Sequence, residues 1–113
     1  MPPEDRIRLR HMLETIDDAS AFLLGQKRSD LDENKMLLFA LLRCVEVIGE
    51  AASRISEATR LAFPTIPWAA MVGMRNRLIH AYFDIDTEIV WKTVTTELPA
   101  LAVRLRPLLH DPQ

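Results

Sequence analysis

The feature that most constrains the fold is an apolar segment in the first half of the chain whose hydrophobic residues recur every three or four positions. These residues form two stripes. The first consists of Leu38, Leu41, Leu42, Val45, Ile48, Ala52 and Ile55, and the second of Leu37, Ala40, Cys44, Val47 and Ala51. Because each apolar stripe of a helix must be covered, the segment predicts a long helix from an N-cap at Ser29 to about Ile55. This helix should be central or should also form an intersubunit contact.

The chain on either side of this segment carries the local signals of shorter helices. Pro3 suits a first helical turn, and apolar residues at helical spacing continue to about Leu24, with Gly25 as the predicted C-cap. A short helical turn is expected to start at Ser56 and to end before Phe63. The sequence therefore predicts a first helix over residues 3–24 and a short one before residue 63.

Two further helices are predicted in the second half of the chain. Pro67 restarts a helix that should continue to about Tyr82, and Asp86 is the predicted N-cap of the last helix. Pro99 lacks a backbone donor, so we expect a kink or break there. No stretch alternates with the two-residue period of a strand. The predicted fold class is therefore all-α, a four-helix bundle with an additional short helix.

The size and cysteine content of the chain narrow its organisation and setting. A chain of 113 residues is expected to form one domain, spanning 1–113, with a single core. No apolar run approaches the about 20 residues of a membrane span, and the acidic start differs from a signal peptide. Cys44 is the one cysteine, which excludes an internal disulfide and a cysteine-built metal site. We expect a cytoplasmic protein without a membrane partner.

The charge of the chain limits how it can meet nucleic acid. Its formal net charge is −2, whereas proteins that bind duplexes strongly and without specificity are usually clearly basic. Most of its basic residues are arginines, which suit local phosphate contacts. Any action on nucleic acid is therefore expected to use a local basic patch or to be transient.

One polar cluster stands out within an otherwise apolar run, at Met74–Tyr82. On a regular helix each residue advances by about 100°. Asn76 and His80 would then share one face, and Arg75 and Tyr82 would share another. Arg75 and His80 would point about 140° apart. Either the helix end distorts, or the working site combines residues from two chains.

The residue types of this cluster suit metal-independent cleavage of RNA. Imidazole moves protons near neutral pH, and a guanidinium stabilises charge that builds on phosphate. RNA carries its own nucleophile, the 2′-hydroxyl, so cleavage needs one base and one acid. His80 is a single proton-transfer group, and a two-fold dimer would supply two. The three histidines show no zinc-ligand spacing. A structural role for Arg75 and His80 as capping or core-edge residues remains open.

Two carboxylates of the predicted long helix, Glu46 and Glu50, lie one turn apart. A carboxylate in a mostly buried helix needs a partner, because a buried unpaired charge is costly. In one interpretation the pair borders solvent or meets Arg54. In the other, Glu50 pairs with Arg75 or orients His80, which makes Glu50 a candidate supporting residue. The sequence leaves both open.

The spacing Arg75, His80, Tyr82 resembles the Arg-x4-His-x-Tyr signature of the HepT-like toxins, which are members of the HEPN superfamily. The resemblance covers most of the chain, and the first helix matches in pattern only. Outside the motif it rests on Val47–Ala52, Ile66–Trp68, Tyr82–Phe83, Ile89–Trp91 and Leu98–Pro99.

The resemblance implies a HEPN bundle that forms a homodimer, with the two motifs facing each other in a cleft. It implies a metal-independent endoribonuclease without a cofactor, the toxin of a toxin–antitoxin pair, with Arg75 and His80 as catalytic residues. Asn76 occupies the polar position that follows the arginine. The implied partner is an MntA-like minimal nucleotidyltransferase antitoxin, which in this family can transfer AMP to the motif tyrosine, here Tyr82.

Two other hypotheses keep the fold and give up catalysis. In the first, the protein is a helical adaptor whose cleft binds a nucleotide or a nucleotidyltransferase partner. Arg75 would then hold phosphate, and His80 would be structural. In the second, the protein is a purely structural dimer. RNA turnover separates both from the ribonuclease hypothesis.

Overall fold

The computed structural model describes residues 1–81 and 84–110, with the backbone alone at residues 80 and 81. Within these ranges the chain is mostly helical, and the predicted all-α fold class is confirmed. The elements, in chain order, are α1 (Pro3–Phe22), α2 (Asp30–Glu33), α3 (Lys35–Ser53), α4 (Glu57–Ala62), α5 (Trp68–Val72), α6 (Met74–Leu78), β1 (Ile79–Ala81), β2 (Asp84–Ile85), α7 (Thr87–Lys92), the π-helical turn η1 (Thr93–Glu97) and α8 (Leu98–His110).

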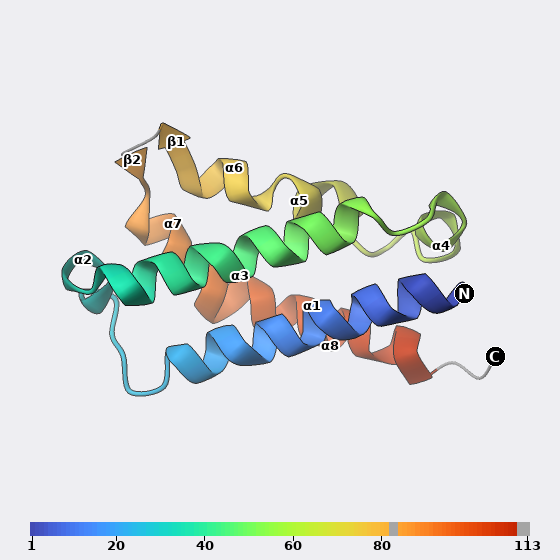
Figure 1. Ribbon diagram of the computed structural model, residues 1–113, viewed down its shortest axis with the longest axis horizontal. Helices are drawn as coiled ribbons and strands as arrows, with labels where there is room; N and C mark the ends of the chain where they lie inside the picture. The colour runs from blue at the N-terminus through green and yellow to red at the C-terminus, as the bar shows by residue number, and fades with distance from the viewer. Residues whose placement is uncertain (82–83, 111–113) are drawn as a thin grey trace.

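Helix α3 lies in the middle of the bundle. It runs antiparallel to α1, and α8 packs against the other side of α1 (Figure 1). The segment formed by α5 and α6 packs against α3 away from α1. The predicted central position of this helix is therefore confirmed. In the described part of the chain, no helix is both long and apolar enough to cross a membrane.

The two apolar stripes of α3 are covered to different degrees. Every member of the first stripe is buried in the core, including Leu41, Val45 and Ile48 at 0% exposure. The second stripe is only partly covered, because Ala40, Val47 and Ala51 are half-buried. The first stripe thus faces the core, and the second remains at the edge of the groove between α1 and α3.

The start of α3 differs from the prediction. The helix begins at Lys35 and not after Ser29, which precedes the separate single turn α2. Asn34 adopts an extended conformation and accepts a hydrogen bond from the backbone N–H of Leu37, 3.1 Å away. An asparagine in this conformation is a strong N-cap, so it ends α2 and begins α3.

A buried carboxylate ties the start of α1 to the start of α4. Asp5 is 1% exposed and accepts hydrogen bonds from Ser56 N (3.1 Å), Ser56 Oγ (2.6 Å) and Thr59 Oγ1 (2.6 Å). Burial acts to raise the pKa of Asp5, but these hydrogen bonds outweigh it and lower the pKa below the usual value. Ser56 also accepts from Thr59 N and is the N-cap of α4, so the predicted start of this short helix is confirmed.

The predicted single helix from Pro67 to Tyr82 is wrong. It is interrupted at Gly73, which ends α5 and begins α6, and it stops at Leu78. Ile79 is extended (φ −121°, ψ 108°) and starts β1, which pairs antiparallel with β2. The backbone N–H of Asp86 donates to the carbonyl of Leu78 at 2.8 Å and closes this hairpin.

The last helical segment follows the sequence prediction closely. The side chain of Asp86 accepts a hydrogen bond from Ile89 N at 3.1 Å, which confirms it as the N-cap of α7. The irregularity predicted at Pro99 takes the form of the π-helical turn η1, which ends at Glu97. A widened turn accommodates a following residue that has no N–H to donate.

Candidate active site

A close contact between α3 and α5 sets the position of the arginine motif. A Cβ atom added to Gly49 would lie 3.2 Å from the carbonyl oxygen of Met71 and 3.4 Å from that of Val72. A side chain at this position would push the two backbones apart by a few tenths of an ångström, and glycine lets them approach this closely. Helix α6 follows directly after α5, so its first residues also pack against α3.

Arg75 on α6 reaches back to α3 and pairs with Glu46. Its Nε donates to Glu46 Oε2 at 3.0 Å, and the other carboxylate oxygen lies 3.5 Å from Nη1 of Arg43. The side chain of Arg75 is 49% exposed, and that of Glu46 is 33% exposed. Within the described residues, the recorded contact of the guanidinium is therefore at Nε, and about half of the side chain is exposed to solvent.

The predicted partnership of Glu50 with Arg75 is not what the structure shows. The ion pair recorded for Glu50 within the described residues joins it to Arg43 Nη1 at 3.9 Å, and its side chain is 68% exposed. The interpretation in which Glu50 borders solvent is thus confirmed, and whether Glu50 orients His80 stays a prediction, because only the backbone of His80 is described. Glu46, one turn earlier, is the partner of Arg75, and the sequence interpretation did not assign it that partnership. Gly49 is the signal in the sequence that could have pointed to Glu46, because a glycine in a helix can mark where another segment, here α5, packs closely against it.

A pocket of about 220 Å³ opens beside this ion pair. It is lined from α3 by Glu46, Gly49, Glu50 and Ser53, and from the α5–α6 segment by Val72, Arg75 and Asn76. The structure thus brings three of the predicted site residues, Arg75, Asn76 and Glu50, to one pocket. Among the described side chains, no three carboxylate, imidazole or thiol groups gather as a metal site would require.

The other two predicted site residues lie at the edge of what the structure describes. His80 is on β1, where its backbone is described, and Tyr82 lies outside the described residues. The predicted sharing of helix faces by Asn76 with His80 is wrong, because the helix ends at Leu78. Of the two alternatives left open by the spacing, the distorted helix end is the one observed.

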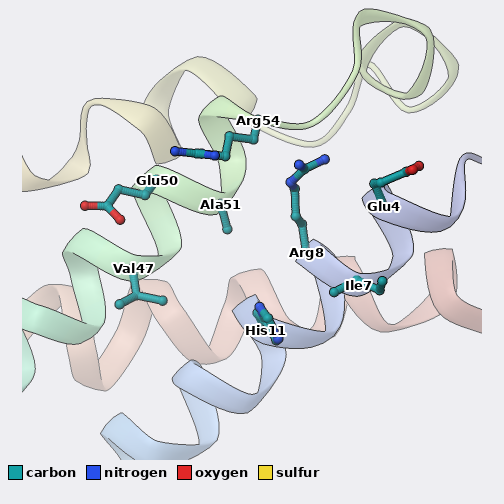
Figure 2. A pocket seen from close by; sticks show the side chains of 8 residues that line it. All are labelled: Glu4, Ile7, Arg8, His11, Val47, Glu50, Ala51 and Arg54. Atoms are coloured by element: carbon teal, nitrogen blue, oxygen red, sulfur yellow. The ribbon is translucent and has the colours of Figure 1, made fainter.

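A second groove runs between α1 and α3 and meets the first pocket at Glu50. It has a volume of about 420 Å³, with Val47 and Ala51 of the second stripe on its α3 side. Figure 2 shows Arg8 rising from α1 toward α3 and Arg54, the C-cap residue of α3, extending in the direction of Glu50, with His11 about one helical turn beyond Arg8. The groove continues past Val47 into a further pocket of about 310 Å³. The half-covered stripe therefore lines an open groove.

Arg77 occupies the opposite side of α6 and gives a second ion pair for comparison. Its Nη1 lies 3.6 Å from Glu97 Oε1, with side-chain exposures of 49% and 37%. Arg77 borders a separate pocket of about 270 Å³ between α5–α6 and α8. One five-residue helix thus carries two similarly exposed arginines that face different surroundings.

Comparison with known proteins identifies the family. The family model described as "Ribonuclease HepT-like" matches residues 12–108. The chain belongs to the HepT-like ribonuclease family. It is 36% identical over 112 residues, 98% of this chain and 93% of the relative, to the Methanocaldococcus jannaschii protein named "Putative RNase MJ1216". It is also 41% identical over 75 residues, 66% of this chain and 68% of the relative, to "Probable ribonuclease HepT" of Thermococcus cleftensis. No solved structure matches the chain significantly.

Membership of the HepT-like family confirms the resemblance drawn from the motif. The matched residues include Arg75, Asn76 and His80, together with Glu46 on α3. The pocket beside Arg75 is therefore the candidate active site of a HepT-like ribonuclease.

Proposed function

We propose that the protein is a metal-independent endoribonuclease in which Arg75 and His80 form the active site within a dimer-interface cleft. The observation that carries this proposal is the state of Arg75. Its recorded partner among the described residues takes Nε, so the two terminal nitrogens remain for a phosphate group at the pocket. A guanidinium held in this way matches the paired oxygens of a phosphodiester.

The proposed reaction uses the 2′-hydroxyl of the RNA as nucleophile. The base removes the 2′-hydroxyl proton, the 2′-oxygen bonds to phosphorus, and the bond from phosphorus to the 5′-oxygen breaks. The acid gives a proton to the departing 5′-oxygen, which leaves a 2′,3′-cyclic phosphate and a 5′-hydroxyl. Arg75 stabilises the negative charge on the non-bridging oxygens. His80 of one protomer acts as base and its dimer mate as acid.

The dimer is supported by the chemistry and by the α1–α3 groove. The sequence argument for a shared site was that Arg75 and His80 would point about 140° apart on one helix. It no longer applies, since His80 is not on the helix of Arg75. The need for two proton-transfer groups remains. The open groove lined by the second stripe of α3 continues to Phe22, and Phe22 and Ile7 are exposed at 44% and 50%. A groove that combines such apolar residues with charged side chains of both signs, such as Glu4 and Arg8, suits a second copy of the chain.

The dimer is tested by light scattering at micromolar concentration. Wild type is expected to scatter as a dimer. Val47→Asp, which places a charge in the groove, is expected to scatter as a monomer with its helical signal retained. Val103→Asp is the matched control, because Val103 is 66% exposed on α8, away from the groove. A monomeric wild type would contradict the dimer proposal.

The proposed biological setting is that of the family resemblance, a toxin held in check by an MntA-like nucleotidyltransferase antitoxin. In the AMP-transfer step the hydroxyl of Tyr82, two residues after His80, would bond to the α-phosphorus of ATP, and pyrophosphate would leave, which adds a bulky anion next to the site. Such an anion would repel an incoming phosphate and would fill the cleft. Intact-mass measurement after incubation with the partner and ATP tests this step, with one added AMP expected and none in Tyr82→Phe.

The activity is tested with purified protein in the presence of a chelator. An RNA oligonucleotide is expected to be cleaved to products that carry a 2′,3′-cyclic phosphate, and DNA of the same sequence is expected to stay intact. Equal cleavage of both would remove the 2′-hydroxyl mechanism. Cleavage of RNA only after a divalent metal is added would overturn metal independence.

The adaptor hypothesis is the second candidate, and the near-neutral net charge of −2 favours it. A chain without a strongly basic balance is expected to hold RNA weakly. The adaptor predicts no RNA turnover under any condition, and partner binding that survives His80→Ala. The chelator assay and a pull-down of the nucleotidyltransferase partner separate the two functions.

A further inference from the structure

The ion pair between Arg75 and Glu46 is more specific than a general surface attraction. Its hydrogen bond joins one nitrogen, Nε, to one oxygen, Oε2, at 3.0 Å. Both side chains are a third or more exposed, so solvent screens the charge and the pair adds little to stability. Its consequence is geometric, because a bond at Nε restricts how the guanidinium plane can rotate.

The position of Glu46 is itself fixed by the packing of the bundle. Glu46 lies three residues before Gly49, where the backbone of α3 meets the carbonyl groups of α5. The carboxylate therefore starts from a regular helix held against the segment that carries Arg75. Arg43 lies 3.5 Å from the second oxygen of Glu46. This second cation offsets the negative charge that Glu46 would otherwise present to a substrate phosphate.

We propose that Glu46 is a positioning residue that orients the catalytic arginine. Its carboxylate holds Nε of Arg75 so that the terminal nitrogens face the pocket shared with Asn76. Glu46 touches neither substrate nor reacting atoms, and it acts through Arg75. The proposal rests on the ribonuclease function proposed above. It adds that an acidic residue on α3 keeps the guanidinium ready for the charge that develops on the phosphate.

The test is steady-state RNA cleavage by three variants of the full-length protein. Glu46→Ala is expected to lower kcat about 10- to 100-fold, because a misplaced catalytic group loses alignment with the transition state. KM should change by less than about threefold, since Arg75 keeps its charge. Glu46→Gln is expected to recover most of kcat, because its amide oxygen still accepts from Nε. In an Arg75→Ala background, Glu46→Ala should have no further effect.

The matched control is Glu97→Ala, which removes the ion-pair partner of Arg77, an arginine on the same helix as Arg75 and equally exposed, together with the acceptor of a hydrogen bond from Thr93 Oγ1 at 3.0 Å. It should leave kcat close to wild type. Melting temperatures are recorded for all variants, so that a loss of folded protein is not mistaken for a loss of alignment. If wild type cleaves RNA and the kcat of Glu46→Ala equals that of Glu97→Ala, the positioning role is overturned. The ribonuclease proposal then stays intact. Absence of any cleavage by wild type overturns both.

Discussion

Two carboxylates each join a pair of helices in this protein, and their surroundings differ. Asp5, at the junction of α1 with α4, is 1% exposed and is surrounded by three donors from Ser56 and Thr59. Glu46, at the junction of α3 with α6, is 33% exposed and binds one nitrogen of Arg75 beside an open pocket. At the first junction, the donors of Ser56 and Thr59 bind the carboxylate of Asp5. The second leaves donors available to a ligand, so we assign stability to the first and function to the second.

The largest expected difference between the two junctions is in the free energy of unfolding. Asp5→Ala removes the buried acceptor of three hydrogen bonds, of which the donor Ser56 Oγ keeps only the longer contact with Thr59 Oγ1 at 3.2 Å, and is expected to cost about 2–4 kcal/mol. Glu46→Ala is expected to cost less than about 1 kcal/mol, because the exposed pair is screened by solvent. Urea unfolding monitored by circular dichroism measures both. Equal losses would show that exposure does not separate the two roles.

A smaller effect is expected when the Asp5 junction is weakened by acid. The pKa of Asp5 is lower in the folded protein than its ordinary value of 3.8. Its contribution is therefore fully present above that value and is lost as the pH falls through the lower folded pKa. The difference in unfolding free energy between wild type and Asp5→Asn should be constant from neutral pH down to about pH 5 and should shrink below that. A difference that grows on acidification would contradict the assignment.

The smallest effect on stability is expected at Gly49, which sets the spacing of the second junction. Gly49→Ala gains about 1 kcal/mol of helix propensity, and crowding against the Met71 carbonyl opposes that gain. The net change in stability should be small, while displacement of α5–α6 lowers the cleavage rate. Gly73→Ala is the control, because its added Cβ would lie 3.6 Å from Ala69 O, an ordinary contact. Equal cleavage by both variants would show that the spacing at Gly49 is not critical.

The local sequence predicted those parts of the fold that depend on neighbours a few residues apart. The core stripe of α3, the start of α4 at Ser56 and the cap at Asp86 all follow from helical periodicity or from short side-chain contacts. The sequence pattern failed where distant pairing overrides local preference. The helix stops at Leu78 because Ile79 pairs with Ile85 across a hairpin, and no spacing of three or four residues reports such a pair.

The sequence indicated candidate residues for the site, but not how these residues are arranged in space. The motif pointed to Arg75, Asn76 and His80, which lie within the stretch that the family model matches, and their roles in the site stay predictions. The partner of Arg75 depends on how far α6 lies along α3, which is a property of tertiary packing. Glu50 was therefore chosen where Glu46 is found, one turn away. The role of Tyr82 stays a prediction, since it lies outside the described residues.

The central claim is that Arg75 is the arginine of a ribonuclease site, and a comparison of the two arginines of α6 tests it most directly. Arg75 and Arg77 are each 49% exposed and each pair with one glutamate. RNA cleavage in chelator is measured at equal protein concentration for Arg75→Ala, Arg77→Ala and wild type. We predict a loss of about 100-fold or more for Arg75→Ala and a rate near wild type for Arg77→Ala. Equal rates for the two variants would contradict the claim.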